Sequence, residues 1–146
     1  MKKKYHQGVY IPVNKLKYKG NYPICYRSSW ELKFFRFCDS NSHILEWSSE
    51  KIVIPYINPV DGRVHRYFTD GNVLMRLRDG GTKKFLIEIK PAKQLQPPNP
   101  NAKRKTLIFE QLRYAINQSK FKTAEQWANK HGYTFLILTE KELNIE

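Results

Sequence analysis

The segment FLIEIKP, residues 85–91, places two opposite charges two positions apart on a stretch that reads as a β-strand. Side chains at positions i and i+2 of a strand project from the same face, so Glu88 and Lys90 point the same way. One interpretation is a solvated strand face. The other is an active site in which the carboxylate holds a hard cation such as Mg²⁺ and the lysine lies beside a reacting phosphate.

A second carboxylate reaches the same face if residues 70–91 fold as a β-hairpin. A three-residue loop at 79–81, in which glycine supplies the positive φ, predicts that Asp70 lies opposite Lys90. Glu88 is then the diagonal neighbour of Asp70, and the apolar residues occupy the other face. Cross-strand neighbours have Cβ atoms about 5 Å apart and diagonal ones about 7 Å apart, which is close enough for two carboxylates to share a cation.

Asp70, Glu88 and Lys90 could together support hydrolysis of a phosphodiester. The two carboxylates supply the oxygen ligands that Mg²⁺ prefers, and the lysine can steer the attacking water and offset the charge of the phosphate. Each residue also has an ordinary structural interpretation. Asp70 precedes Gly71, and Asp-Gly is a turn signature in itself, while Glu88 and Lys90 could form a surface ladder of charges.

The segment SSWELKFFRFC, from Ser28, predicts a helix that packs on the core through Trp30, Phe34 and Phe37 at i, i+4 and i+7. Glu31 on this helix is a fourth candidate, because its carboxylate could reach the metal or the metal-bound water. The alternative is that Glu31 completes a capping box with Ser28. On the sequence alone, both roles are compatible.

The chain is strongly basic, with 26 Lys and Arg against 13 Asp and Glu and a formal net charge of +13. This charge favours nucleic acid as the partner over a membrane surface, because no segment reads as a basic amphipathic helix or approaches transmembrane length.

The histidines lack zinc-ligand spacing and the two cysteines lack a CxxC pattern, so neither a zinc site nor a disulfide framework is expected. The basic start lacks the apolar run of a secretory signal, which predicts an intracellular protein.

The composition also suggests how the chain is divided. Residues 1–27 hold seven Lys or Arg, five Tyr and no acidic residue. We interpret them as a basic arm laid over the domain or the ligand, with a solvated terminus as the alternative. Residues 28–146 are expected to form a single domain. The candidate DNA-binding residues are Arg27, Lys93, Lys103, Arg104 and Lys105.

The other elements predict an α/β sandwich with a mixed sheet. Residues 51–57 and 64–68 are rich in β-formers and are joined by the turn sequence NPVDG, which indicates a hairpin. A helix is expected to begin near Lys103. KTAEQWANKHG is expected to form another helix that ends at Gly132.

The C-terminal segment contains a near-continuous apolar run, YTFLILT, residues 133–139, which predicts a buried strand. Thr139 and Glu142 match a capping box, so a short last helix is expected to follow.

The pattern resembles that of the PD-(D/E)xK nuclease superfamily: Glu31 on a helix, TD at 69–70 and EIK at 88–90, in the order helix, strands, helix, strand. More narrowly, several segments are similar to the TnsA-type endonuclease branch, and most closely to the head-completion nucleases of large contractile-tailed phages. These segments are RSSWELKFFRF, LEWSSEKIVIPY, RVHRYFTD, FLIEIKP and TAEQWANKHGYTFLILTEKEL.

The resemblance implies a restriction-endonuclease-like fold and a Mg²⁺-dependent deoxyribonuclease, with Mn²⁺ as a substitute metal. It implies that this nuclease trims or cuts packaged DNA so that phage heads can join tails. Phage head or portal proteins would be partners, and the protein would act in the host cytoplasm during assembly or in association with the virion. By the same resemblance Asp70 and Glu88 are metal ligands, Lys90 is the catalytic lysine, and Glu31 assists metal binding.

Two positions depart from the superfamily pattern. Thr69 stands where proline is usual, and Gly71 follows Asp70 where a bulkier strand residue is expected, which predicts a looser strand. Two other functions remain as alternatives: a DNA-binding assembly factor without enzymatic activity, and a transposon-end or restriction-type endonuclease with the same chemistry. Two carboxylates that face phosphate favour an enzyme, because like charges repel unless a cation lies between them.

Overall fold

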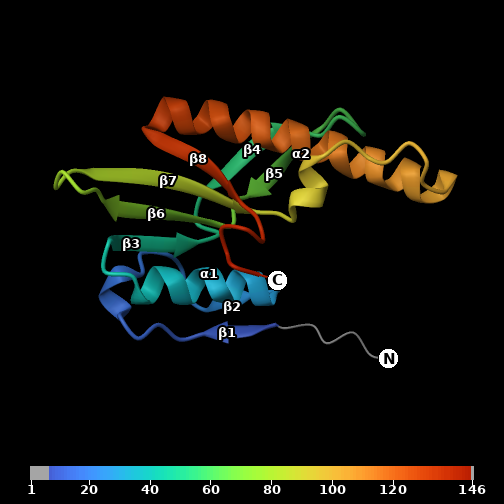
Figure 1. Ribbon diagram of the computed structural model, residues 1–146. Helices are drawn as coiled ribbons and strands as arrows, with labels where there is room; N and C mark the ends of the chain where they lie inside the picture. The colour runs from blue at the N-terminus through green and yellow to red at the C-terminus, as the bar shows by residue number, and fades with distance from the viewer. Residues whose placement is uncertain (1–6, 146) are drawn as a thin grey trace.

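The computed structural model describes residues 7–145 and has the mixed α/β architecture that the sequence predicts. The helices α1 and α2 lie on opposite sides of a central sheet (Figure 1). The elements are β1 (Gly8–Tyr10), η1 (Lys15–Lys17), β2 (Ile24–Tyr26), α1 (Ser29–Ser40), β3 (Ile44–Ser49), β4 (Val53–Ile57), β5 (Val64–Phe68), β6 (Gly71–Arg76), β7 (Thr82–Ile89), η2 (Ala92–Leu95), α2 (Arg104–His131) and β8 (Tyr133–Leu138).

The central sheet has the strand order β3-β6-β7-β8. Strands β3, β6 and β7 pair antiparallel, whereas β8 returns parallel to β7 after the crossover through α2. The mixed sheet is therefore confirmed, and its parallel pair is explained by the helical crossover that such a pair requires. Strands β4 and β5 form a separate antiparallel ribbon packed on α2, which confirms the predicted hairpin.

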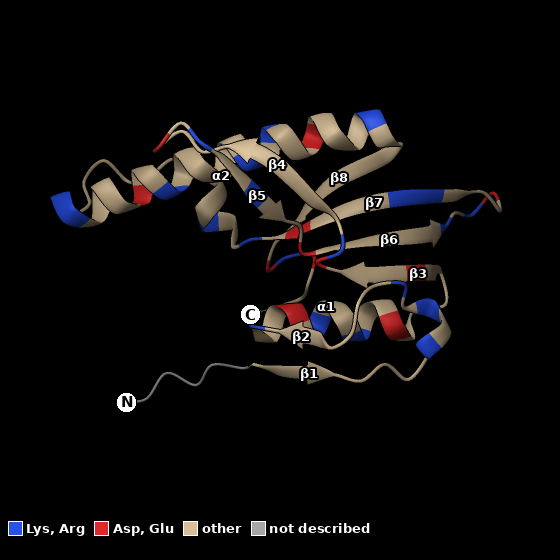
Figure 2. Ribbon diagram, turned by 180° about the vertical axis from the view of Figure 1, so that it is seen from behind, with Lys and Arg blue, Asp and Glu red and all other residues tan. Residues whose placement is uncertain are grey.

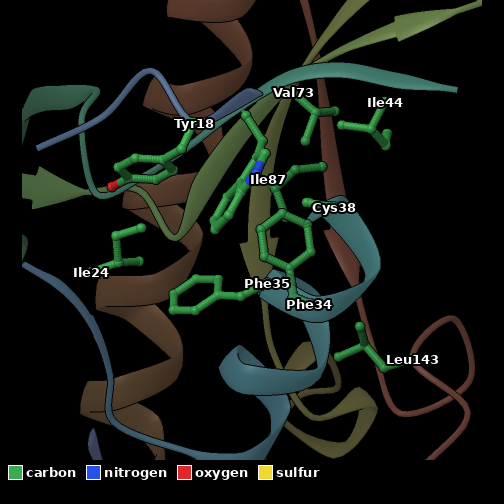
Figure 3. Close-up of a cluster of buried hydrophobic side chains, with 10 residues drawn as sticks. Tyr18, Ile24, Phe34, Phe35, Cys38, Ile44, Val73, Ile87 and Leu143 are labelled. Carbon is green, nitrogen blue, oxygen red and sulfur yellow. The ribbon is translucent and has the colours of Figure 1, made fainter. Parts of the chain in front are cut away.

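The sheet separates two hydrophobic cores, because successive residues of β7 point to opposite faces. Ile87 packs in the core on the α1 side together with Phe34 (Figure 3). Leu86 packs in the other core with Ala124 of α2 and the tyrosines of the β4–β5 ribbon. Glu88, two residues after Leu86, therefore lies on the face that α2 and the ribbon cover.

The register of the β6–β7 hairpin differs from the predicted one by two residues. Arg76 lies opposite Thr82, so the loop between the strands has five residues and not three. A hydrogen bond of 2.8 Å from Leu77 N to Gly81 O closes this loop. Because the shift is even, every side chain keeps its predicted face, as the apolar alternation demands.

The same shift changes the neighbour of Asp70. The observed ladder begins at the pair of Gly71 with Ile87, so Asp70 comes beside Glu88. The prediction that Asp70 lies opposite Lys90 is therefore wrong, although all three residues still belong to the same face. The two carboxylates come closer together than the predicted register would place them.

Helix α1 begins at the residue that the sequence indicates. Ser28 is its N-cap, and the Ser28 hydroxyl accepts a hydrogen bond of 3.2 Å from Glu31 N. Phe34 and its neighbour Phe35 are buried at 2% and 1% exposure, whereas Phe37 is 49% exposed. The prediction that Phe37 packs on the core is thus wrong, because the buried side of the helix contains residues 34, 35 and 38.

The two helices expected after Lys103 are one helix of 28 residues, α2. No glycine or proline interrupts residues 104–131, so nothing in the backbone ends the first helix before the second begins. Gly132 ends α2 as predicted, with φ of 77° in the left-handed region. Despite this length, residues 7–145 contain no helix apolar enough to span a bilayer.

The last segment differs from its prediction in two ways. Strand β8 is at the edge of the sheet, and Leu136 is 37% exposed, so the strand is only partly covered. The capping interaction after it does form, since Glu142 Oε1 accepts a hydrogen bond of 3.1 Å from Thr139 N. However, the chain makes only a turn here and not the expected helix.

The described part of the basic N-terminal segment packs against α1. Tyr18 and Ile24 are buried in the core on the α1 side. The carboxylate of Asp39, near the end of α1, accepts hydrogen bonds from Val13 N at 2.7 Å and Asn14 N at 2.9 Å. Residues 7–27 therefore contact α1 and contribute two side chains to the core, and the lysines at 2–4 fall outside the described residues.

Candidate active site

Asp70 lies in the corner between β5 and β6. The preceding residue, Thr69, is fully buried, and both its backbone N and its hydroxyl donate to Ile52 O, at 3.2 and 2.9 Å. These two bonds fix the corner at the position where the superfamily pattern has proline. Asp70 Oδ2 in turn accepts a hydrogen bond of 2.6 Å from Ile89 N, which holds the carboxylate at the end of β7.

Glu88 is held in place from two sides. It is 4% exposed, and its Oε2 accepts a hydrogen bond from the hydroxyl of Tyr67. Its Oε1 lies 3.5 Å from the Nζ of Lys90, which directly follows the last residue of β7. A buried carboxylate is expensive to leave unpaired, and these partners offset that cost. The interpretation of Glu88 and Lys90 as a solvated ladder does not describe this pair, because both side chains are largely covered.

Burial and neighbouring charge affect the ionisation of Asp70. Burial, followed by the nearby negative charge of Glu88, raises the pKa of Asp70 well above its usual range. Glu31 adds a smaller effect in the same direction, and Lys90 opposes it. Acidic segments gather where β6 begins and β7 ends (Figure 2). Glu88 and Glu31 therefore place negative charge near Asp70, and a bound cation would relieve their mutual repulsion.

Glu31 reaches the same region while it also stabilises the start of α1. Its Oε2 accepts hydrogen bonds from Arg27 N at 3.0 Å and from the Ser28 hydroxyl at 3.2 Å. The capping interaction predicted for Glu31 is therefore present, with Arg27 N as the backbone donor in place of Ser28 N. Since Glu31 also raises the pKa of Asp70, the helix-capping carboxylate and the site carboxylates share one electrostatic environment.

Two further residues of the site were not found from the sequence. Tyr67 is 2% exposed and donates its hydroxyl to Glu88. Lys120 of α2 places its Nζ 5.5 Å from the centre of the Tyr67 ring. The available signals were the position of Tyr67 three residues before Asp70 and the helical spacing of Lys120 with Ala124, which is buried against the sheet.

The donor set suits a hard divalent cation. Within residues 7–145 no group of three or more His, Cys, Asp or Glu side chains has metal-binding geometry. Asp70 and Glu88 nevertheless supply two carboxylates, and Mg²⁺ commonly binds through one or two carboxylates together with water and phosphate oxygens. The placement of the two side chains supports this fit: Asp70 is held at the end of β7 by Ile89 N, and buried Glu88 lies beside it in the sheet.

The candidate DNA-binding residues fall into two groups. Arg27 and Lys93 form the first group, and each is close in the sequence to one candidate site residue, Glu31 or Lys90. Arg27 adjoins Glu31, and its guanidinium pairs with Glu50. Lys93, three residues after Lys90, lines an open cavity of about 400 Å³ together with Tyr114 of α2.

Residues 103–105 form the second group, at the start of α2, where all three are exposed. From Arg104 to Lys120 the helix advances about 24 Å, at about 1.5 Å per residue. The basic start of α2 is therefore remote from the carboxylates. A DNA duplex that contacts both the start of α2 and the carboxylates would have to run along α2 for about seven base pairs, at about 3.4 Å per base pair.

Comparison with known proteins identifies the family. Residues 41–140 match the family described as TnsA-like endonuclease N terminal. The chain is 40% identical over 144 residues to the head completion nuclease of Enterobacteria phage T4, an alignment that covers 94% of this chain and 93% of that protein. The chain belongs to the TnsA-like endonuclease family, as its sequence resemblance predicts.

Proposed function

We propose that this member of the TnsA-like endonuclease family is a metal-dependent DNA nuclease that hydrolyses phosphodiester bonds at Asp70, Glu88 and Lys90. One observation carries the proposal: two carboxylates lie together at the end of β7, with the Lys90 ammonium 3.5 Å from one of them. The match to an endonuclease family and to a protein named as a nuclease supports the same activity.

In this proposal Asp70 and Glu88 bind Mg²⁺, which Mn²⁺ can replace, and Glu31 assists them. A bound divalent ion would act as a Lewis acid on the phosphodiester and lower the pKa of its water. The protein's own residues do the positioning. Ile89 N orients Asp70, Tyr67 orients Glu88, and Lys90 is placed to orient the attacking water and to offset the charge that develops on the phosphate.

The carboxylates argue against the alternative of a DNA-binding assembly factor without activity. Asp70 and Glu88 present negative charge on a protein whose net charge of +13 otherwise favours DNA. Such a pair weakens pure phosphate binding, and its burial costs free energy. A cation held by Asp70 and Glu88 would remove both costs, so the arrangement fits catalysis better than binding alone.

The basic residues provide the DNA-binding surface in this proposal. The first turn of α2 contains no acidic residue and no side-chain cap, although the helix dipole favours negative charge there. Lys103, Arg104 and Lys105 occupy that turn instead, and a DNA phosphate would compensate both the dipole and their mutual repulsion. Arg27 and Lys93 would contact DNA nearer the cleavage point.

The biological setting is proposed from the named relative. A head completion nuclease points to action on packaged DNA before the phage head joins the tail, in the host cytoplasm during assembly or with the virion. Phage head or portal proteins would then be partners. A transposon-end or restriction-type endonuclease with the same chemistry is the second candidate, which the endonuclease family itself favours.

The test is cleavage of linear and closed-circular plasmid by purified protein in Mg²⁺, Mn²⁺ and EDTA. Asp70→Ala and Lys90→Ala should each abolish cleavage while DNA binding remains. Asp79→Ala, on the exposed β6–β7 loop, and Lys130→Ala, at the end of α2, are matched controls that should cleave normally. Loss of the circular form separates internal cuts from trimming of ends.

Two results would overturn the proposal. Cleavage at the wild-type rate by Asp70→Ala would show that the metal and the reaction lie elsewhere. DNA binding without any cleavage in Mg²⁺ or Mn²⁺ would favour the assembly factor.

A further inference from the structure

Lys120 is held in an unusual position for a lysine on the surface of a helix. It lies one turn before Ala124, which is fully buried, so it is on the side of α2 that faces the sheet. Its Nζ lies 5.5 Å from the ring centre of Tyr67 and 5.6 Å from that of Tyr56. Both tyrosines are buried, at 2% and 5% exposure. The ammonium group is therefore fixed by two aromatic faces.

This position connects Lys120 to the carboxylates. The hydroxyl of Tyr67 donates to Glu88, so a single tyrosine ring separates the ammonium group from that carboxylate. Within residues 7–145 Lys120 makes no salt bridge, although its side chain is only partly exposed. Its three N–H donors thus have no hydrogen-bond acceptor among these residues and remain available to a ligand.

The electrostatics agree with this placement. Burial, and then the positive charge of Lys90, lowers the pKa of Lys120, while Glu88 and Asp70 oppose the change. Lys120 therefore interacts electrostatically with Asp70, Glu88 and Lys90. The two lysines approach the carboxylates from different elements, Lys90 from the sheet and Lys120 from α2.

We propose that Lys120 is a catalytic residue that binds the DNA phosphate at this site from the α2 side. The inference rests on the proposed nuclease function and adds a residue that its sequence motif does not include. A lysine fixed by aromatic rings keeps its charge directed at the site without neutralising the carboxylates by a direct ion pair. A phosphate that enters between the helix and β7 would then meet positive charge on both sides.

The competing explanation is that Lys120 only packs on the two tyrosines. Lys120→Met distinguishes the two, because methionine keeps much of the apolar stem and removes the charge, and Lys120→Gln is a second uncharged variant should Met prevent folding. Lys120→Arg restores the charge. The matched control is Lys122→Met, at an exposed position two residues farther along the same helix.

Two measurements are made on each variant. The first is the dependence of duplex affinity on salt in EDTA, where no cleavage occurs. Removing one phosphate contact should reduce the slope of log K against log salt by about 0.9. The second is the single-turnover cleavage rate in saturating Mg²⁺, which should fall about a hundredfold in Lys120→Met and recover to within about tenfold of wild type in Lys120→Arg.

An unchanged salt slope in Lys120→Met, together with a cleavage rate within about threefold of wild type, would make Lys120 a packing residue and overturn the inference. Failure of the proposed function is recognised separately. If the wild-type protein did not cleave in Mg²⁺ or Mn²⁺, the nuclease proposal would fail, while the salt slope in EDTA would still decide whether Lys120 contacts phosphate.

Discussion

The ring of Phe34 lies directly against Gly71. A Cβ atom added to Gly71 would lie 2.7 Å from Cε2 of Phe34 and 3.0 Å from the backbone oxygen of Ser48. The glycine that follows Asp70 therefore does not loosen the strand, as the sequence pattern suggested. It allows α1, which carries Glu31, to approach the start of β6, which follows Asp70.

This close contact predicts the effect of Gly71→Ala. The added methyl group must displace either a buried aromatic ring or a backbone carbonyl, and such overpacking costs about 1–3 kcal/mol of unfolding free energy. The displacement also moves α1 relative to Asp70, so cleavage should fall along with stability. Urea unfolding followed by circular dichroism, together with the plasmid assay, measures both effects.

Gly81→Ala is the matched control for this change. The added Cβ atom would lie 3.0 Å from Asp79 Oδ1, the end of an exposed side chain that can rotate away at the cost of one exposed hydrogen bond from Gly81 N. Stability equal to wild type in Gly71→Ala would mean that Phe34 adjusts freely, and the proposed coupling between α1 and β6 would be wrong.

Tyr67→Phe tests the support of Glu88. The variant removes the hydroxyl that donates to Glu88 Oε2 and leaves a buried carboxylate with one partner fewer. Loss of such a partner costs about 1–3 kcal/mol. We expect a lower unfolding midpoint in EDTA and weaker apparent Mg²⁺ affinity in the cleavage assay. Tyr114→Phe, on α2 beside the open cavity, is the control. Equal Mg²⁺ dependence in Tyr67→Phe and wild type would exclude a role for this hydroxyl.

The β6–β7 hairpin illustrates how much of the site could be predicted from the sequence. The alternation of apolar residues determined which side chains share a face, so Asp70, Glu88 and Lys90 were correctly placed together. The pairing within that face depended on the loop length, which the glycines did not determine. The loop has five residues, closed by the hydrogen bond from Leu77 N to Gly81 O, and the pairing is therefore shifted by two residues from the predicted one.

Lys120 and Tyr67 were missed for a different reason. Their roles depend on how α2 and the β4–β5 ribbon cover the sheet, which is a tertiary relationship, and the two residues are more than fifty positions apart in the sequence. Division of α2 into two helices hid this relationship further, since it obscured the continuous face that contains Lys120 and Ala124. Periodicity identifies the covered face of a helix, but it does not identify what covers that face.

Asp70→Asn tests the electrostatic state of the site. Burial and Glu88 raise the pKa of Asp70 in the folded protein above its unfolded value, which is about 3.9. The folded state therefore binds the proton more strongly, and the contribution of Asp70 to stability falls as pH rises above about 4. In EDTA at pH 7.5 the variant should be more stable than wild type, and the difference should shrink toward pH 4.

Magnesium should reverse this order. A ligand that binds only the folded state raises the unfolding temperature, so Mg²⁺ should stabilise wild type and leave Asp70→Asn unchanged. Thermal unfolding across the two pH values, with and without Mg²⁺, makes the comparison, with Asp79→Asn as the control. An Asp70→Asn variant less stable than wild type in EDTA at pH 7.5 would contradict the raised pKa.

Asp39→Asn should have the opposite dependence on pH. Burial disfavours the charge of Asp39, but hydrogen bonds from Tyr10, Val13 and Asn14 hold its pKa below the ordinary value. The ionised side chain therefore stabilises the protein above the unfolded pKa of about 3.9, and this contribution is lost as pH falls through the folded pKa.

At pH 7 we expect Asp39→Asn to lower the unfolding free energy by about 2–3 kcal/mol, because at least one of the three donors loses its acceptor. The loss should be smaller at pH 3. Urea unfolding at the two pH values measures it, and Glu46→Gln, which is exposed, is the control. An equal loss at both values would show that the charge of Asp39 is not what secures the N-terminal segment to α1.

Replacement of Lys103, Arg104 and Lys105 by alanine tests the basic start of α2 as a DNA contact. These residues lie about 24 Å along the helix from Lys120, so they can bind phosphates without touching the reaction. The triple variant should bind duplex more weakly, and its salt slope should fall by about one unit for each lost contact. Cleavage of DNA at saturating concentration should be nearly unchanged, because the carboxylates and Lys90 remain.

Duplexes that extend less than about seven base pairs beyond the cut should bind wild type and variant equally, since they cannot reach the first turn of α2. An unchanged salt slope with long duplex would dismiss the start of α2 as part of the DNA-binding surface.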